Sequence, residues 1–534
     1  MEFRYAISLV LEAHLPFVRE SAYSPSGKED SLSLTREEEC FFEYVTETFL
    51  PLLEVMDRLE NDHVPFHLAL MISPILCHML CDEYLRKKYL NFVDKQIEFG
   101  LQEIERASGQ AELKELAQAY YDKFVEKRTA FTERYEKDFF KPINFYRSRG
   151  KLEILGSCAT HAFLPFLSHN AESIQAQMEI PVSIYRDHFG SSPQGFWMPA
   201  LGWTQAIEPY LQAYNFSYTI VDAHGLLFGD PSAKKGTFYP VKTPNGIFIL
   251  GRDYYSIKEI ENISTDALYR NNDRDVGYEL PPKIVSRFLS GEGERRGTGY
   301  KYWKRGENID AIYNPRAASE KAIQHAKLFM EKTIARLEEA SKYMEEAPLC
   351  LCAQNADNVG RFWHEGPLFI EALFRMASDY KDFQFITPSE YIFRQNLSSI
   401  QISAPEFSSC GVNGYAETWL DVSNDWIYRH LRRSMERMTE LAERFPDDTG
   451  LKERALNQAA REVLLAQSSD WPSMLYRGES TEFARGQAEN ALRNFTTIYE
   501  ALGSNYISTE WLTNLERSHN IFPNINYRVF RRKR

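Results

Sequence analysis

Seven short apolar segments, each followed by a stretch with helical periodicity, constrain the fold of this 534-residue chain most strongly. They are continuous apolar runs rather than alternating patterns, which is typical of strands buried on both faces. Strands that alternate with helices predict a parallel sheet, either open or closed into a barrel. The segments are residues 5–11, 65–72, 152–158, 195–198, 216–222, 247–251 and 348–354. Their number predicts an α/β barrel with insertions.

Two stretches are longer than a connection between strands needs. Residues 84–147 are rich in charge and strongly helical, which predicts an inserted helical subdomain. Residues 253–316 carry many Gly, Arg and Asn and predict a long loop or lid. From residue 403 on, apolar residues recur every three to four positions, as in helices that pack on one another. We expect a barrel domain over residues 1–402 that includes both insertions, and a C-terminal helical domain over residues 403–534.

Charge and apolar patterning exclude several classes of partner. The chain has 62 basic and 75 acidic residues and a net charge of −13, whereas a nucleic-acid-binding surface needs a basic field. No run approaches the eighteen apolar residues of a membrane helix, and the N-terminal run lacks the cleavage site of a signal peptide. The seven Cys sit mostly in apolar runs, as expected of free thiols in a reducing compartment. We expect a cytoplasmic protein without nucleic-acid or membrane partners.

Candidate functional residues follow the apolar runs, because chemistry in parallel α/β barrels takes place at the C-terminal ends of the strands. Each residue alone is a weak signal, but their convergence on one rim predicts a site. They are Glu12, His14, Thr160, His161, Trp197, Trp203, Asp222, His224, Arg252, Asp253, Gln354, Asn355, Asp357, Arg361, Phe362, Trp363, His364 and Glu365.

Five segments give the chain a specific resemblance to glycoside hydrolase family 57, and most of all to its 1,4-α-glucan branching enzymes. LVLEAHLPF resembles the family's His-x-His-x-Pro segment, CATHAFLPF its Ala-Thr-His-Gly-Tyr-Leu-Pro segment and GFWMPALGW its Gly-x-Trp-x-Pro-Glu segment. AQNADNVGRFWHEG resembles the Asp-x-Glu-x-x-Gly-His-Trp-Trp-x-Glu-Gly segment, and SSDWPSML the Ser-Asp-Trp-Gln segment. The resemblance covers essentially the whole chain. It implies a (β/α)7 barrel, an inserted helical domain, a C-terminal helical domain and a role in the metabolism of glycogen-like polysaccharide.

The resemblance also implies two catalytic carboxylates, and this chain lacks both. In the family a glutamate is the nucleophile and an aspartate the acid/base of a retaining double displacement. The matching positions here are Ala200 and Asn355, which cannot attack a glycosyl carbon or donate a proton near neutral pH. We therefore predict a pseudoenzyme that binds α-1,4-glucan or maltooligosaccharide, with no cofactor and no metal. The residues expected to bind the glucan are His14, His161, Trp197, Trp203, Asp222, Arg361, Trp363, Glu365 and Trp471.

Aromatic residues make up 14% of the chain, and sugar rings stack on exposed aromatic faces. Most Tyr and Phe fall in strand runs or on amphipathic helix faces, where we expect them in the core. The predicted sugar platforms are Trp197, Trp203, Phe362, Trp363 and Trp471, because they lie in the segments that resemble the family.

Glu12 leaves three alternatives open. It stands where the family has a histidine, and Asp357 matches an acidic position of the fourth segment, so a relocated pair such as Glu12 with Asp357 would give an active branching enzyme or α-glucanase. Glu12 could instead form an ion pair with Arg361. It also belongs to a set of residue types that suit zinc or manganese, namely Glu12, His14, His161 and Asp222. A further class of function is a scaffold whose helical domain binds a protein partner or a second copy of the chain.

Overall fold

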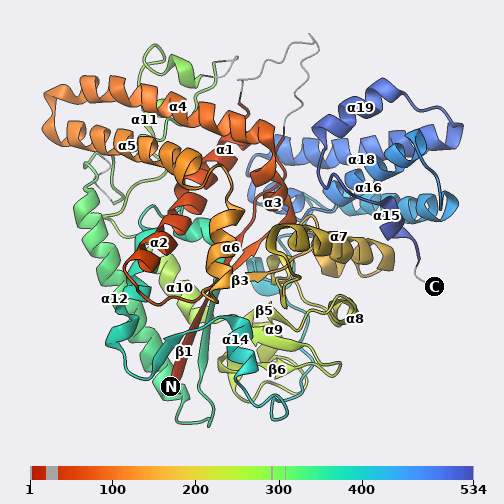
Figure 1. Ribbon diagram of the computed structural model, residues 1–534, viewed down its shortest axis with the longest axis horizontal. Helices are drawn as coiled ribbons and strands as arrows, with labels where there is room; N and C mark the ends of the chain where they lie inside the picture. The colour runs from red at the N-terminus through yellow and green to blue at the C-terminus, as the bar shows by residue number, and fades with distance from the viewer. Residues whose placement is uncertain (1–2, 20–33, 290–292, 307, 309, 533–534) are drawn as a thin grey trace.

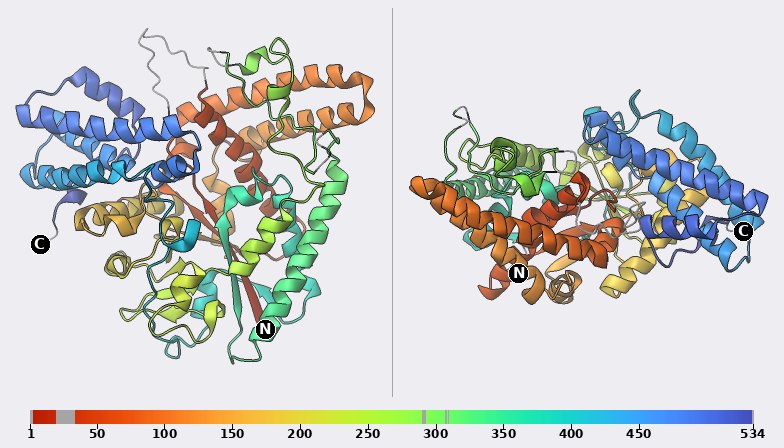
Figure 2. Two further views of the ribbon diagram at one scale, coloured as in Figure 1. Left: turned by 180° about the vertical axis from the view of Figure 1, so that it is seen from behind. Right: turned by 90° about the horizontal axis from the view of Figure 1, so that it is seen from above.

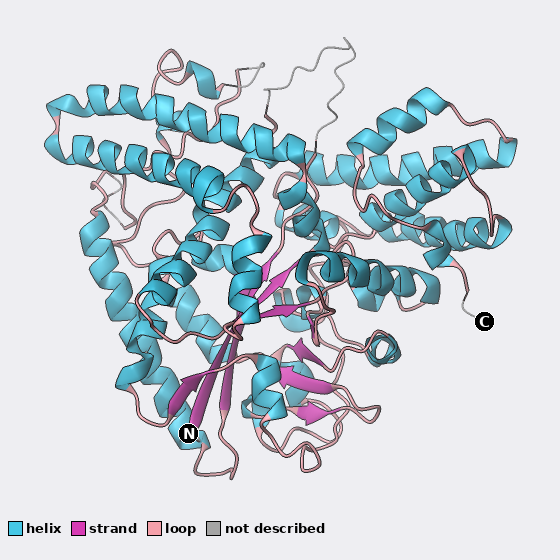
Figure 3. Cartoon of the chain, in the orientation of Figure 1, coloured by secondary structure: helices cyan, strands magenta, loops and turns pink. Residues whose placement is uncertain are grey.

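A computed structural model describes residues 3–19, 34–289, 293–306, 308 and 310–532 (Figure 1). Two β-sheets lie among helices, and a group of helices formed by the C-terminal part of the chain lies to one side (Figures 2 and 3). The first sheet has the order β3 (Leu152–Leu155), β2 (Leu68–Ile72), β1 (Tyr5–Ala13), β8 (Leu349–Asn355), and β9 (Phe383–Phe385) also pairs with β1. The second has the order β4 (Gly195–Phe196), β5 (Tyr218–Val221), β7 (Phe248–Gly251), β6 (Val241–Lys242).

All seven predicted apolar segments contain a strand, and every pair among these strands is parallel. Their residues are almost all buried, as continuous apolar runs require. The α/β class is therefore confirmed. The sequence did not predict β6, which is antiparallel to β7, or β9.

Hydrogen bonds cross both seams between the two sheets. On one side, Gly156 after β3 forms a parallel bridge with Phe196 of β4. On the other, the Asp253 backbone N–H after β7 donates to the Leu351 carbonyl of β8 over 2.8 Å. The ladders themselves end at these seams, so closure into a barrel stays a prediction.

The insertion at residues 84–147 is mostly helical. Helices α4 (Glu83–Arg106) and α5 (Ala111–Thr129) form a long hairpin (Figure 1). Asp82 caps α4, because its carboxylate accepts the Leu85 N–H over 3.1 Å. The described part of the stretch 253–316 is less regular but includes α10 (Tyr254–Ile263) and α11 (Val276–Glu279), and it leads into α12 (Pro315–Ala340).

The C-terminal part of the chain is helical, as predicted. Its amphipathic helices bury their apolar faces against one another. They are α15 (Trp426–Arg444), α16 (Leu451–Ala466), α17 (Asp470–Arg477), α18 (Thr481–Ser504) and α19 (Thr509–Ser518). The other helices are α1 (Arg36–Tyr44), α2 (Leu50–Asn61), α3 (Pro74–Cys81), α6 (Phe140–Ser148), α7 (Ala171–Phe189), α8 (Glu208–Ala213), α9 (Ala223–Leu227), α13 (Gly366–Met376) and α14 (Pro388–Phe393).

The seven cysteines are free thiols, four of them buried. Within the described ranges, no helix combines the length and apolar character needed to cross a membrane.

Candidate functional site

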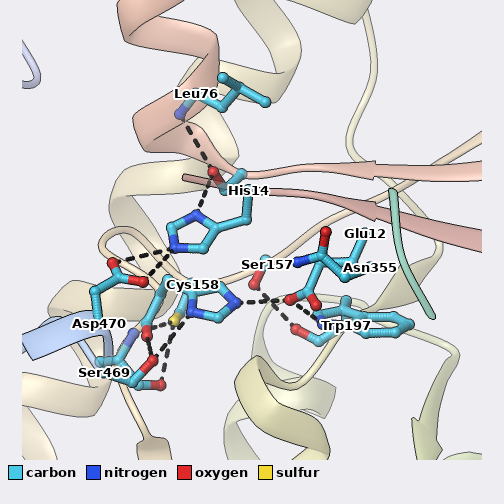
Figure 4. Close-up of polar contacts among 12 residues, drawn as sticks. Glu12, His14, Leu76, Ser157, Cys158, Trp197, Asn355, Ser469 and Asp470 are labelled. Atoms are coloured by element: carbon cyan, nitrogen blue, oxygen red, sulfur yellow. Dashed lines mark hydrogen bonds and ion pairs between the residues drawn. The ribbon is translucent and has the colours of Figure 1, made fainter. Parts of the chain in front are cut away.

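The ends of four strands bring the predicted rim residues together. Glu12 of β1 and Asn355 of β8 are register partners on adjacent parallel strands, so their side chains point to the same side. His161 follows β3 and Trp197 follows β4. Asp470 enters from the C-terminal helices, because residue 468 forms an antiparallel bridge with Ala162. Figure 4 shows Glu12, Trp197 and Asn355 at one end of this cluster and His14 and Asp470 at the other.

The Glu12 carboxylate is held by two N–H donors. Its Oε1 atom accepts from His161 Nε2 and from Trp197 Nε1, each over 2.7 Å. Burial alone would raise the pKa of Glu12, but the hydrogen bond and the charge of His161 outweigh it and lower that pKa. Glu12 is therefore an ionised carboxylate at neutral pH, with one oxygen engaged and its side chain 12% exposed.

His14 has the same pattern of partners as His161. Its Nδ1 lies 2.8 Å from Ser73 Oγ, and its Nε2 lies 3.0 Å from Asp470 Oδ1. His161 likewise has Nδ1 at 3.0 Å from Ser469 Oγ and Nε2 on Glu12. Each imidazole thus lies between a serine hydroxyl and a carboxylate.

The hydrogen bonds indicate which ring is charged. The Ser469 hydroxyl donates its only proton to the His161 carbonyl over 2.5 Å, so its oxygen accepts from His161 Nδ1–H. Both nitrogens of His161 are then donors, as in an imidazolium. Burial opposes the charged form, but the hydrogen bond to Glu12 and its charge raise the pKa of His161. For His14, burial dominates over the charge of Asp470 and lowers the pKa.

The cluster of His14, His161 and Asp470 does not fit a metal ion. Ligand atoms of the three residues lie within 4.8 Å of one another. The two imidazoles, however, are stacked with centroids 3.7 Å apart and planes 11° apart, whereas a ring nitrogen binds a metal in the plane of its ring. The proposed fourth ligand, Asp222, instead forms an ion pair with Arg252.

Ala200, at the position of the family nucleophile, lies in a small apolar cluster. It is 8% exposed and packs in a cluster with Phe163, Ala416 and Trp419, and the rings of Phe163 and Trp419 stack 5.1 Å apart. Its φ of 56° is left-handed, a conformation that costs a residue with a Cβ atom on the order of 1 kcal/mol. Ala200 therefore holds a strained backbone conformation at a position that carries no carboxylate.

Asn355, at the position of the family acid/base, caps a short helix. Its Oδ1 accepts from the Asp357 backbone N–H over 2.8 Å at the start of the 3₁₀ helix Ala356–Val359. Asp357 is 3% exposed, and it accepts from Thr48 Oγ1 over 2.7 Å and pairs with Arg361 over 2.6 Å. The interpretation of Glu12 as the partner of Arg361 was therefore wrong.

Glu365 holds the stretch 253–316 against the rim. Its Oε1 accepts from the Arg270 backbone N–H over 3.1 Å and from Tyr313 Oη over 2.8 Å. The side chain of Arg270, 1% exposed, pairs with Glu47. Glu47 also bonds to Lys123 of α5 and to His364. Burial and the charge of Arg270 lower the pKa of His364 to about 3, so this ring is neutral.

The predicted sugar platforms differ in exposure. Phe362 is 54% exposed and offers a ring face to solvent. Trp203, Trp363 and Trp471 are at most 1% exposed, and the indole N–H groups of Trp203 and Trp471 donate to the carbonyls of Pro405 and Leu465. Trp197 is 3% exposed. A sugar ring needs an exposed face, so in this structure these four indoles act as core, and their binding role stays a prediction.

Sequence reasoning missed five partners of the predicted residues, and among these five only Ser73 directly follows a strand, β2. Ser73, Ser469 and Asp470 complete the histidine cluster, and Thr48 and Glu47 lie on the π-helix Val45–Phe49. A signal for Ser469 and Asp470 was present, because the segment SSDW that contains them resembles the family's Ser-Asp-Trp-Gln segment. Residues 45–49 read as ordinary amphipathic helix and carried no such signal.

Comparisons with known proteins match the same family over most of the chain. A model of glycosyl hydrolase family 57 matches residues 8–403, and a model of the 1,4-alpha-glucan branching enzyme C-terminal region matches residues 430–530. The 1,4-alpha-glucan branching enzyme TK1436 of Thermococcus kodakarensis is 25% identical over 519 residues, covering 93% of this chain and 73% of that protein.

Two solved structures share the fold over nearly the full length. The alpha-amylase AmyC from Thermotoga maritima has a TM-score of 0.90 and 31% identity, covering 100% of both chains. The GH57-type branching enzyme from Pyrococcus horikoshii has a TM-score of 0.87 and 22% identity, covering 99% of this chain and 97% of that one.

Proposed function

Because this chain belongs to glycosyl hydrolase family 57, we propose that it binds α-1,4-glucan at the rim around Glu12 without cleaving or transferring it. The observation that carries the proposal is the pair Ala200 and Asn355, at the positions where the family has its nucleophile and its acid/base. The match of residues 430–530 to the branching-enzyme C-terminal region supports a glucan of the kind that branching enzymes process.

The surroundings of both positions support the loss of chemistry. The Ala200 methyl group lies among apolar side chains. None of the side chains in this cluster carries a positive charge that could pair with an ionised carboxylate at position 200. The Asn355 carbonyl oxygen is engaged as a helix cap. Loss of a nucleophile costs up to about a million-fold in rate, and the rest of a catalytic set cannot recover it.

A glucan would meet polar groups suited to its hydroxyls. The charged pair of Glu12 and His161 presents a carboxylate of which one oxygen is engaged. Such a carboxylate can accept hydrogen bonds from neighbouring sugar hydroxyl groups. Phe362 offers a ring face near the same rim, and stacking on it would orient the glucosyl unit.

A second candidate is an active branching enzyme or α-glucanase that uses Glu12 as a relocated nucleophile. The lowered pKa of Glu12 favours it, because a nucleophilic carboxylate must be ionised. Asp357 is poorly suited as its acid partner, since it is buried in an ion pair with Arg361. This candidate therefore lacks a proton donor among the residues proposed for it.

We also propose that the seven parallel strands form the (β/α)7 barrel of residues 1–402, followed by the helical domain of residues 403–534. The hydrogen bonds at both seams between the sheets support closure. The two family models, which match residues 8–403 and 430–530, support the same division.

Incubation of the purified protein with amylose tests the proposed function. We expect no new reducing ends and no α-1,6 branches, but saturable binding of maltoheptaose in isothermal titration calorimetry. Glu12→Gln should weaken that binding about tenfold, the effect of removing one charge-assisted hydrogen bond. Product formation that Glu12→Gln abolishes would instead establish the relocated enzyme. Absence of both product and binding would leave the alternative of a scaffold that binds a protein partner or a second copy of the chain.

A further inference from the structure

Asp253, one of the rim acids, does not point into the candidate site but supports a groove on the outer surface. Its backbone follows β7, and its carboxylate caps α10 by accepting the Ser256 N–H over 2.7 Å. Helices α10 and α12 pack side by side (Figure 1). A groove with a volume of about 450 Å³ lies between them. It is lined by Tyr255, Ser256, Lys258, Glu259, Asn262, Lys332, Thr333, Ala335 and Arg336.

Tyr255 is an exposed aromatic ring that an ion pair holds in place. The ring is 66% exposed, yet the Arg336 guanidinium lies 5.2 Å from its centroid. Arg336 is itself fixed by Asp253, since two of its nitrogens lie 2.9 Å from the two carboxylate oxygens. Asp253 is 3% exposed. Arg336 thus holds one face of the Tyr255 ring in place. A ligand that stacks on the other face would therefore cost little side-chain entropy on binding.

The charges around the groove cancel in pairs. Lys332 lies 2.8 Å from Glu259, and Lys258 lies 2.6 Å from Glu261. Arg336 is neutralised by Asp253. A phosphate, a nucleic acid or an acidic peptide would find no unpaired cation among these three. A neutral polyhydroxyl ligand is suited to such a groove, because the paired groups and the Asn262 amide can still exchange hydrogen bonds with hydroxyls.

We propose that this groove is a second α-glucan-binding site, in which a glucosyl ring stacks on Tyr255. The inference rests on the proposed function, which supplies the class of ligand. An aromatic face beside hydrogen-bonding groups is the arrangement that holds a ring with both apolar and polar edges. Tyr254, 54% exposed and 5.7 Å from Tyr255 in a T-shaped contact, extends the aromatic surface.

Two sites on one protein would favour long chains. A polysaccharide held at the rim raises the local concentration of its other segments at the groove, whereas an oligosaccharide too short to reach from one to the other gains nothing from the second site. The groove would therefore raise the affinity for glycogen more than the affinity for small maltooligosaccharides.

Affinity electrophoresis through gels that contain glycogen tests the proposal. Tyr255→Ala should raise the apparent Kd for glycogen about fivefold, the loss expected for one aromatic stacking contact. Tyr255→Phe keeps the ring and should stay within about twofold of the unchanged protein. Tyr506→Ala is the matched control, because Tyr506 is 77% exposed and lies two residues past the end of α18, away from the groove residues.

The outcomes separate this proposal from the function on which it rests. If Glu12→Gln reduces retardation and Tyr255→Ala matches Tyr506→Ala, the groove is not a glucan site and the rim alone binds. If Tyr255→Phe loses affinity as Tyr255→Ala does, stacking is not the interaction and the proposal also fails. If the unchanged protein is not retarded at all, the proposed function fails and the groove with it.

Discussion

The imidazole rings of His14 and His161 stack with centroids 3.7 Å apart and planes 11° apart, yet they differ in charge. His161 donates from both nitrogens to Ser469 and Glu12, so it is an imidazolium. His14, whose pKa burial lowers, is the neutral ring on which that cation rests. A cation over a neutral ring is attractive, whereas two imidazolium rings at this distance would repel each other.

Glu12→Gln should destabilise the protein, because it leaves the buried charge of His161 without its partner. Breaking a buried ion pair by removing one member costs about 3–5 kcal/mol. Part of the site is open to solvent, so we expect about 3 kcal/mol in the free energy of unfolding, measured by urea denaturation at pH 6. Glu489→Gln is the control, since its pair with Arg485 is exposed, and such pairs contribute about 0–1 kcal/mol. Equal effects of the two substitutions would contradict the imidazolium.

The stability contributed by the pair should depend on pH in both directions. The folded pKa of His161 is raised above 6.5, so its contribution is present below that value and is lost as pH rises through the folded pKa. The folded pKa of Glu12 is lowered below 4.5, so its contribution is present above that value and is lost as pH falls through the folded pKa. The Tm difference between the unchanged protein and Glu12→Gln should be largest between pH 4.5 and 6.5. A difference that grows steadily toward pH 9 would contradict this assignment.

The strands could be predicted because each is a continuous apolar run buried on both faces. β1 shows this best, with eight of its nine residues buried. β6 and β9 could not, since Lys242 and Gln384 interrupt these short strands and neither strand forms a continuous apolar run. The pairing of β1 with β9 depends on tertiary packing that local sequence does not encode.

The site could be predicted only as far as strand ends specify it. Glu12, His161 and Trp197 meet because parallel strands present their carboxyl ends together. Asp470 could not be placed, since 456 residues separate it from His14. Charge signs also left partners open, because Glu12 was the acid considered for Arg361, whereas its partner is Asp357, four positions earlier in the sequence.

Two neighbouring aromatic residues should respond differently to truncation. Trp363 is 1% exposed and packs against Tyr269 and Phe369, so Trp363→Ala should lower the free energy of unfolding by about 3–5 kcal/mol. Phe362 is 54% exposed, so Phe362→Ala should change stability by less than about 0.5 kcal/mol. Phe362→Ala should weaken maltoheptaose binding without changing Tm, whereas Trp363→Ala should lower Tm. Unchanged binding in that variant would remove Phe362 from the site.

Asp357→Asn should act on structure rather than on chemistry. The substitution removes the buried partner of Arg361 and leaves that guanidinium at the rim without its nearest anion. We expect a loss of about 3 kcal/mol in the free energy of unfolding, with the amylose products of the variant equal to the blank, as for the unchanged protein. If the unchanged protein forms product, and Asp357→Asn abolishes that product without loss of stability, Asp357 would instead be supported as a relocated acid.

Restoring both carboxylates should restore chemistry if the rim has kept its shape. Asn355→Asp preserves the helix cap, because an aspartate oxygen accepts the Asp357 N–H as well as an amide oxygen does. Ala200→Glu places a carboxylate on a turn that already has the left-handed φ of 56°. We expect new reducing ends or branches from amylose in the double variant and none in either single variant, because nucleophile and acid act as a unit. The double variant could instead form no product although it is folded and still binds maltoheptaose. That result would mean that the apolar cluster around Ala200 keeps a glycosyl carbon away from position 200.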